Sequence, residues 1–491
     1  MTEIRLEELN LKRIHLVGVG GAGMNALTDV LLDLGYPVSG SDLKLSATTT
    51  ALAARGATIF EGHRAENLDG ATLVVKTAAA RDDNPELVEA ARLGLALLTL
   101  AQMVGVLANS RRCLAIAGTH GKTTTTALVA WLLTGVGRDP TFFIGGVSQN
   151  LGVAGRAGQG EFVVVEADEY ARRFLELRPE VALITNLEPD HLDYYGTFEA
   201  IVEAFQHYAW NVRPGGTLLA PLPLEEEEGS GLATLGAALL EAGYLEDRNY
   251  ETYALVEEPT GRATFEAVLK AINSQGGYDF AFYEAEELLA QVSLSLPGIH
   301  NVKNVTAALA LCHLAAPDVE MAHFSRLAGE FKGTRRRFEV KGETPHGVTV
   351  VDDYAHHPTE LKATLAAARV RFAGRRLVAL FQPHTFSRTK AHLDEFAQSF
   401  GDADLVALLE IFPARETDNL GVSSASLLEK IAYPEKVPHV LTHQMAAEEL
   451  RKVLKPGDVL LTLGAGDVWK VGETILDFRF WLLDLAFKFG F

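Results

Sequence analysis

Cysteine is scarce in this chain of 491 residues, which has only Cys113 and Cys312. Two thiols exclude a disulfide framework and a zinc site built from several cysteines. Both residues lie in apolar runs, so we expect them to be core residues of a protein from a reducing compartment.

Basic residues are also in short supply, with 44 Lys and Arg against 64 Asp and Glu, which gives a net charge of −20. This balance argues against a broad nucleic-acid surface, and it requires local positive groups to hold any anionic ligand. No apolar run reaches the 18 residues that a transmembrane helix needs, and the acidic start lacks the apolar segment of a signal peptide. We therefore expect a cytoplasmic protein, a monomer or a homodimer, with no nucleic-acid partner and no transmembrane segment.

What the sequence does contain is α/β patterning, in which short apolar strands alternate with helical stretches. The pattern restarts twice and predicts three α/β domains, over residues 1–111, 112–332 and 333–491. Between about 221 and 275 the pattern is less regular, and the acidic run 225–228 is expected to form a solvated loop. The aromatic residues of 478–491 predict a packed terminal helix, with a dimer contact or a membrane-surface contact as alternatives.

The strongest chemical signal is Gly-Thr-His-Gly-Lys-Thr at 118–123, between the apolar run 113–117 and the helical stretch 127–133. A strand, a glycine turn and a helix N-terminus form a cradle for nucleotide phosphates. Lys122 would add positive charge near the β- and γ-phosphates, and Thr123 would offer a hydroxyl to Mg²⁺. The spacing departs from the Walker pattern because Ile116 stands where that pattern has glycine. The loop predicts ATP use, with a chance surface turn as the alternative.

A second glycine-rich turn follows the predicted strand 14–17, with Gly18, Gly20, Gly21 and Gly23 leading into a helix from Met24. Asp42, at the end of the next strand, is the acid expected near a ribose. This fingerprint alone favours NAD. A separate ATP loop in the same chain makes a substrate that carries pyrophosphate, such as a UDP-sugar, the better prediction.

Carboxylates and histidines follow two strands of the second domain. Glu166 ends the strand 162–166 and is predicted to hold Mg²⁺, with a solvated acidic turn as the alternative. His191 follows the strand 181–185 and is either a second metal ligand, a phosphate contact or a surface residue. Asn301 and Asn304 share one side of a helix, which suggests nucleotide recognition, although a helix N-cap explains Asn301 almost as well.

The third domain also carries polar groups at strand ends. Arg337 belongs to a three-arginine run at the predicted boundary and either clamps phosphate or is solvated. Asp353 follows one predicted strand, and the loop with His384 and Arg388 follows another. Both loops should open at one edge of the sheet, either as part of a shared cleft or as ordinary polar loops.

Taken together, these motifs resemble the Mur ligases of peptidoglycan synthesis over nearly the whole chain. The resemblance rests on GVGGAGM (18–24), GHRAENL (62–68), DNPEL (83–87), GTHGKTTT (118–125), EADEY (166–170), TNLEPDHLDYY (185–195), GIHNVKN (298–304), GTRRRFE (333–339), VDDYAHHPTE (351–360), FQPHTFSRT (381–389) and GAGD (464–467). It implies an N-terminal Rossmann-like UDP-binding domain, a central P-loop-type ATPase domain and a Rossmann-like C-terminal domain.

Site residues carry over by motif match. The resemblance implies catalytic roles for Lys122, Glu166, His191, Arg337, Asp353 and His357, and a magnesium site of Thr123, Glu166 and His191. ATP would be bound by Gly118, Thr119, His120, Gly121, Lys122, Thr123, Thr124, Asn301, Asn304 and Arg337. The UDP-sugar would be bound by Gly18, Gly20, Gly21, Gly23, Asp42, His63, His384 and Arg388. Of these, His384 and Arg388 would lie on the side of the substrate carboxylate and the amino acid.

The motifs most resemble those of the family members that use ATP and Mg²⁺ to join L-alanine to UDP-N-acetylmuramate. Three alternatives remain: a recycling ligase that adds a tripeptide to the same UDP-sugar, a catalytically idle paralogue that binds it, and an NAD-dependent oxidoreductase. Departures from the family pattern at Leu100, Ala171 and 221–275 bear on substrate specificity and, less strongly, on activity. None of them touches the phosphate loop.

Overall fold

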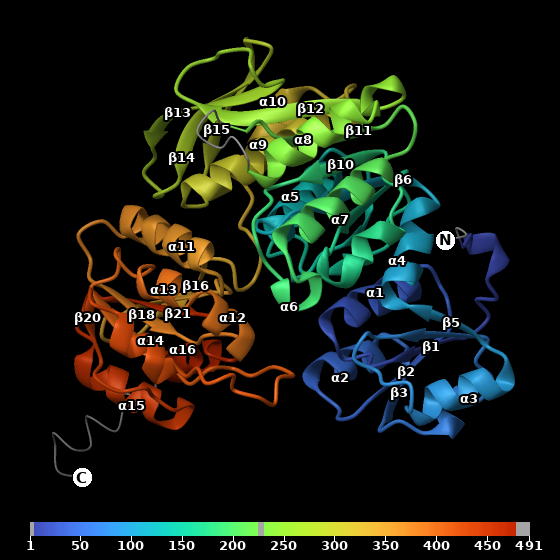
Figure 1. Ribbon diagram of the computed structural model, residues 1–491, viewed down its shortest axis with the longest axis horizontal. Coiled ribbons are helices and arrows are strands. Elements are labelled where there is room, and N and C mark those ends of the chain that lie inside the picture. Colours follow the sequence, from blue (N-terminus) through green and yellow to red (C-terminus); the bar gives the residue numbers. More distant parts are fainter. Residues whose placement is uncertain (1–3, 224–229, 478–491) are drawn as a thin grey trace. The chain divides into compact units, whose positions relative to one another are not determined.

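The computed structural model of the chain describes residues 4–223 and 230–477 (Figure 1). The acidic run 225–228 and the aromatic segment 478–491, for which a loop and a helix are predicted, lie outside these residues. The chain divides into two compact units. The first comprises residues 1–269, 280–292 and 303–332, and the second comprises 270–279, 293–302 and 333–491. The predicted boundaries at 111 and 332 stay predictions.

The first sheet has five parallel strands in the order β3-β2-β1-β4-β5. Its elements are β1 (Ile14–Val17), α1 (Ala22–Asp33), β2 (Val38–Asp42), α2 (Ala47–Ala54), β3 (Thr58–Glu61), β4 (Leu73–Lys76), α3 (Pro85–Leu93), β5 (Ala96–Thr99) and α4 (Leu100–Asn109), with single turns η1 (Leu6–Glu8) and η2 (Ala65–Leu68). The strand order reverses beside β1, so the glycine turn after β1 lies at a topological switch point, where α/β proteins bind ligands.

The second sheet has ten strands in the order β15-β14-β13-β12-β11-β10-β6-β9-β7-β8, and its four neighbouring strands β10-β6-β9-β7 run parallel. The sheet contains β6 (Arg112–Ala117), β7 (Thr141–Phe143), β8 (Gly155–Arg156), β9 (Phe162–Glu166), β10 (Val181–Ile184), β11 (Thr217–Pro221), β12 (Asn249–Val256), β13 (Phe265–Ile272), β14 (Tyr278–Glu284) and β15 (Glu287–Leu294). The helices are α5 (Lys122–Gly135), α6 (Leu192–Tyr195), α7 (Phe198–Trp210), α8 (Gly231–Glu241), α9 (Ile299–Ala315) and α10 (Met321–Gly329), with 3₁₀ segments η3 (Tyr170–Glu176) and η5 (Tyr244–Glu246).

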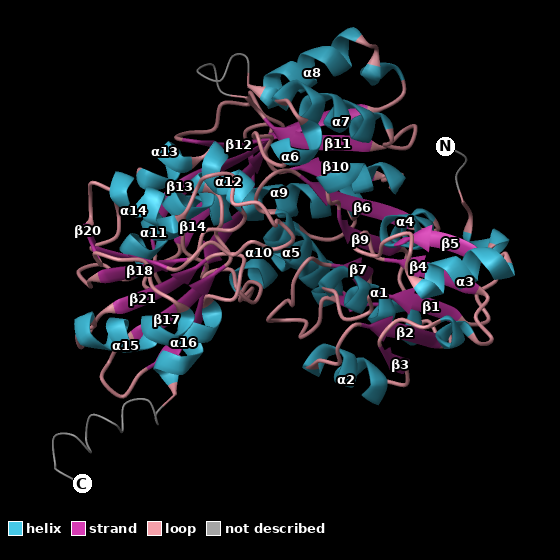
Figure 2. Ribbon diagram, turned by 60° about the horizontal axis from the view of Figure 1, so that its bottom comes forward, coloured by secondary structure: helices cyan, strands magenta, loops and turns pink. Residues whose placement is uncertain are grey.

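The third sheet lies in the second unit and has the order β16-β17-β21-β18-β19-β20, with only β16 antiparallel to its neighbour. Figure 2 shows its strands β17, β21 and β18 side by side. It contains β16 (Glu339–Glu343), β17 (Thr349–Asp353), β18 (Leu377–Phe381), β19 (Leu405–Leu408), β20 (Glu435–Lys436) and β21 (Val459–Leu463). The helices are α11 (Pro358–Arg371), α12 (Phe386–Ala391), α13 (Leu393–Ala397), α14 (Ser424–Lys430), α15 (His443–Val453) and α16 (Trp469–Leu476).

Successive strand residues face opposite layers, which produces a core on each side of the sheets. In the third sheet, Val351 and Leu461 pack with residues of α11, α13 and α14, whereas their neighbours Val350 and Leu460 pack with residues of α15 and α16. In the first sheet, Leu16 packs with residues of α1 and α4. Apolar side chains therefore explain why helices cover both faces of the third sheet.

The predicted α/β class with three domains is confirmed, but one detail of the sequence reading is wrong. Residues 230–275 are regular, since they form α8, β12 and β13. Cys113 and Cys312 are fully buried, as predicted, and burial raises the pKa of the Cys113 thiol to about 12. Among the described residues, no helix is long and apolar enough to cross a membrane.

Candidate active site

The phosphate loop connects β6 to α5 and depends on two glycines with left-handed backbone. Gly118 has φ of +130° and Gly121, the residue before α5, has φ of +82°. A Cβ atom on Gly118 would lie 2.1 Å from Oγ1 of Thr185. The loop thus requires glycine here both for its conformation and for its close approach to the neighbouring strand end.

The segment after β10 fixes this loop by hydrogen bonds. Thr185 Oγ1 donates to the carbonyl of His120 at 2.5 Å, and the Asn186 side chain accepts from His120 N at 2.8 Å. Thr119 Oγ1 accepts from Glu188 N at 2.9 Å. Because β10 lies beside β6 in the sheet, two segments far apart in the sequence form one preorganised loop.

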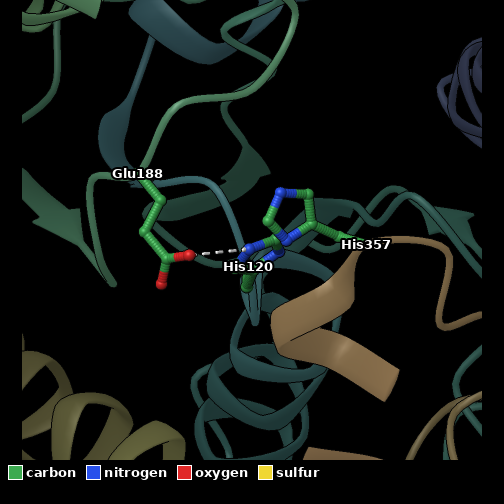
Figure 3. A group of neighbouring side chains, drawn as sticks. All are labelled: His120, Glu188 and His357. Atoms are coloured by element: carbon green, nitrogen blue, oxygen red, sulfur yellow. Dashed lines mark ion pairs between the residues drawn. The ribbon is translucent and has the colours of Figure 1, made fainter. Parts of the chain in front are cut away.

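His120 and Glu188 also meet through their side chains, with 3.5 Å between Nε2 and Oε2 (Figure 3). The histidine side chain is mostly buried and the carboxylate is about one-third exposed. A carboxylate beside the ring orients the imidazole, so the predicted ATP-loop residue His120 has a defined position.

Lys122, in the first turn of α5, is held by Glu169. Its Nζ donates to Glu169 Oε1 at 2.9 Å and to the carbonyls of Gly118 and Thr119 at 2.5 and 3.1 Å. Burial lowers the pKa of Lys122, but the Glu169 carboxylate outweighs it and raises the pKa above its ordinary value, so the ammonium stays charged. Sequence reasoning missed Glu169 as a site residue, although it belongs to the same EADEY motif as Glu166.

Thr123 and Glu166, two members of the predicted magnesium site, lie in contact. Thr123 Oγ1 donates to Glu166 Oε1 at 2.9 Å, and the other carboxylate oxygen accepts from Gly145 N at 2.5 Å. Hydroxyl and carboxylate oxygens are ligands that suit Mg²⁺. The third predicted member, His191, lies beside Glu169 instead, with Nε2 3.7 Å from Oε1.

The two predicted nucleotide-recognition asparagines differ in their surroundings. A Cβ atom on Gly121 would lie 2.4 Å from Oδ1 of Asn304, so Asn304 packs directly against the phosphate loop. Asn301 is buried and its Nδ2 donates to the carbonyl of Pro297 at 2.7 Å, which secures the start of α9. Asn304 therefore contacts the phosphate loop.

The glycine turn after β1 has the geometry predicted for a pyrophosphate loop. Gly18 has φ of +82°, and Gly20 N donates to Asp42 Oδ2 at 2.9 Å. A Cβ atom on Gly20 would lie 2.9 Å from that same oxygen, and one on Gly23 would lie 2.8 Å from Leu100. Gly21 directly precedes α1, whose N-terminus suits an anion. One oxygen of Asp42 thus supports the turn itself.

In the second unit, Asp353 and His357 have structural partners. Asp353 accepts from the backbone N–H groups of Phe338 and Ala355, both at 2.7 Å. Its burial raises the pKa to about 6. His357 precedes α11 and its Nδ1 accepts from Thr359 N at 3.4 Å. The catalytic roles predicted for Asp353 and His357 stay predictions.

The remaining predicted residues of the second unit form two small groups. Arg337 lies 3.6 Å from Glu360 and above the ring of Tyr354. Arg388 donates to His384 Nδ1 at 3.4 Å, and the His384 ring stacks on Phe412. Each predicted cation therefore has a side-chain partner in its own unit.

Fold and site together define an α/β protein with one phosphate loop of the nucleotide-binding type and a second glycine turn at a topological switch point. Three family models match the chain: Mur ligase family, catalytic domain, at 13–112; Mur ligase middle domain at 116–312; and Mur ligase, glutamate ligase domain, at 336–466. The chain belongs to the Mur ligase family.

Relatives of nearly the same length support this membership. The chain is 42% identical to UDP-N-acetylmuramate–L-alanine ligase of Geobacter sulfurreducens, over 95% of this chain and 97% of the relative. It is 39% identical to the ligase of the same name from Salinibacter ruber, over 97% of each chain. A crystal structure of UDP-N-acetylmuramate–alanine ligase from Thermotoga maritima matches with a TM-score of 0.75 at 27% identity, over 96% of this chain and 99% of that one.

Proposed function

We propose that this protein joins L-alanine to the lactoyl carboxylate of UDP-N-acetylmuramate and converts ATP to ADP and phosphate, a step of peptidoglycan synthesis. The observation that carries the proposal is the phosphate loop with Lys122 in place, together with full-length similarity to relatives named for this reaction. The glycine turn after β1 supplies the proposed second site, for the UDP-sugar.

The reaction needs activation because oxide is a very poor leaving group. The carboxylate attacks the γ-phosphorus of ATP, the bond to the bridging oxygen breaks, and ADP leaves with that oxygen. Lys122 and the N-terminus of α5 stabilise negative charge on the phosphoryl oxygens during this transfer. Mg²⁺, held by Thr123 and Glu166, would supply further positive charge to the same oxygens.

The acyl phosphate then acylates the amino acid. The uncharged amine of L-alanine attacks the carbonyl carbon, phosphate leaves from the tetrahedral intermediate, and the extra proton of the amine passes to a base. His191 or Arg337 is proposed to stabilise the intermediate, and His357 and Asp353 are proposed to help the proton transfer. His384 and Arg388 are proposed to hold the substrate carboxylate and the amino acid.

Phosphate release by the purified chain tests the proposal, with ATP, Mg²⁺ and UDP-N-acetylmuramate and with product masses checked. Release with L-alanine but not with L-Ala-γ-D-Glu-diaminopimelate is expected. Release only with the tripeptide would indicate a recycling ligase, and binding of the UDP-sugar without release would indicate an idle paralogue.

Lys122→Ala separates the two proposed sites. We expect this variant to lose ATP turnover while UDP-sugar binding survives, with Lys430→Ala as the control because Lys430 is exposed and pairs with Asp394. Loss of UDP-sugar binding in Lys122→Ala would contradict the assignment of separate sites.

A further inference from the structure

Glu86 is a fully buried carboxylate at the start of α3, surrounded by donors from other segments. Its Oε1 accepts from Asn67 Nδ2 at 2.6 Å and lies 3.4 Å from His15 Nε2. Its Oε2 accepts from Ser41 Oγ at 2.7 Å and lies 3.0 Å from His63 Nδ1. A buried charge with this many partners is rare unless its position matters, because burial without them costs several kcal/mol.

The charge of Glu86 is fixed by these partners. Burial would raise its pKa, but hydrogen bonds from His15, Ser41 and Asn67 outweigh burial and hold the pKa at about 2. An ionised carboxylate only accepts hydrogen bonds. Ser41 gives its hydroxyl proton to Glu86, so both neighbours of His63 Nδ1, Ser41 Oγ at 2.9 Å and Glu86 Oε2 at 3.0 Å, act as acceptors. A ring proton is therefore on Nδ1, and in the neutral form of the ring the lone pair is on Nε2.

The same network supports the glycine turn after β1. The carbonyl of Ser41, whose hydroxyl binds Glu86, accepts from Gly18 N at 2.8 Å. Asn67, the second donor, also donates to the carbonyl of Gly62 at 3.0 Å, directly before the histidine. Glu86 thus links the turn proposed to hold pyrophosphate with the segment that carries His63.

The His63 side chain is 17% exposed, and among the described residues its Nε2 has no partner. We propose that Glu86 is a positioning residue for the nucleotide sugar: it holds His63 with Nδ1–H turned into the protein and with Nε2 presented to the ligand as a hydrogen-bond acceptor. The ligand group opposite Nε2 is then a donor, a hydroxyl or the imide N–H of the base, and not a phosphate oxygen. This inference rests on the proposed UDP-sugar site.

Glu86→Gln tests the role because the amide keeps the size of the side chain but donates from one end. That end meets either Asn67 or the pair Ser41 and His63, all of which donate to Glu86 now. We expect the affinity for UDP-N-acetylmuramate, measured by calorimetry, to fall about tenfold, as is common when a hydrogen-bond partner of a ligand-binding histidine is lost. ADP affinity should not change. Asp29→Asn is the matched control, since Asp29 is a buried carboxylate of α1 that pairs with Arg55 instead.

A double variant shows whether Glu86 acts through His63. In the His63→Ala background, Glu86→Gln should have no further effect on UDP-sugar affinity, because the group that Glu86 positions is gone. A tenfold loss that persists in this background, or a Glu86→Gln affinity equal to that of Asp29→Asn, would overturn the inference.

A spectroscopic measurement on the wild-type protein tests the inference without any substitution of Glu86. In protein labelled with ¹⁵N-histidine, with His63→Gln used for assignment, the neutral form of the His63 ring should carry its proton on Nδ1. A proton on Nε2 would refute the inference even if the UDP-sugar binds. Failure of the wild-type protein to bind UDP-N-acetylmuramate would instead contradict the proposed function.

Discussion

Gly118→Ala should disable the phosphate loop without unfolding the protein. An alanine at φ of +130° is strained, which costs of order 1–3 kcal/mol. Its Cβ would also lie 2.1 Å from Thr185 Oγ1 and 2.9 and 3.0 Å from the backbone nitrogens of Thr185 and Asn186. The side chain of Thr185 can rotate, but the two nitrogens belong to backbone, so the loop itself must move.

We therefore assign about 3 kcal/mol to the loss of the binding conformation, which corresponds to roughly 100-fold weaker ATP binding. Adding Thr185→Ala removes the shortest contact and leaves the backbone contacts and the strain, so affinity should recover only in part. Isothermal titration of ATP into each single variant and the double variant measures these steps.

Gly137→Ala is the matched control. Gly137 has φ of +80°, and no atom lies within 4 Å of a Cβ atom built on it. This substitution should cost about 1 kcal/mol of stability and leave ATP affinity unchanged. The explanation from loop geometry is refuted if the ATP dissociation constant of Gly118→Ala is within threefold of the wild-type value. It is also refuted if Gly137→Ala weakens ATP binding as much as Gly118→Ala does.

Three further predictions concern a charge, a metal pair and a core hydroxyl. Because the pKa of Glu86 is about 2 in the folded protein and 4.5 ordinarily, its ionisation stabilises the fold by about 3 kcal/mol above pH 4.5, a contribution lost as the pH falls from 4.5 to 2. Denaturant unfolding from pH 7 to pH 3 should show about 2 kcal/mol of this loss in the wild type and not in Glu86→Gln. If Thr123 and Glu166 hold Mg²⁺, Glu166→Gln should raise the Mg²⁺ concentration for half-maximal phosphate release at least tenfold, and an unchanged requirement would contradict the pair. The buried Tyr208 hydroxyl donates to the Ala115 carbonyl at 3.1 Å, so Tyr208→Phe should lower the free energy of unfolding by about 1 kcal/mol, with no change expected in ATP affinity.

Much of the fold could be predicted from the sequence because strands, turns and helix starts depend on local residue patterns. The predicted strands 58–61, 73–76, 162–166 and 459–463 agree with β3, β4, β9 and β21. The prediction that 221–275 is irregular was wrong for two reasons. Its strands β12 and β13 are partly exposed, which weakens their apolar pattern, and an acidic run precedes α8 in the sequence.

The site was harder to predict because it depends on which strands are neighbours. The phosphate-loop motif singled out Thr123, a strand end singled out Glu166, and the family resemblance placed both in one magnesium site; the two side chains are in contact. The partners that hold the loops are Thr185, Glu169 and Glu86, and the sequence did not predict them. Their roles arise because β10 and β9 lie on either side of β6 and because α3 packs against β1 and β4. No local pattern reports such pairings.

The two buried cysteines have a practical consequence for measurements of motion. A thiol reacts as the thiolate, and the fully buried Cys113, with a pKa of about 12, is almost entirely protonated at neutral pH; burial also raises the pKa of Cys312. New cysteines at the exposed positions Val88 and Met445, one in each unit, would then be labelled selectively by maleimide dyes. The native sequence therefore serves directly as the background for fluorescence energy transfer between the units as ATP and UDP-sugar are added.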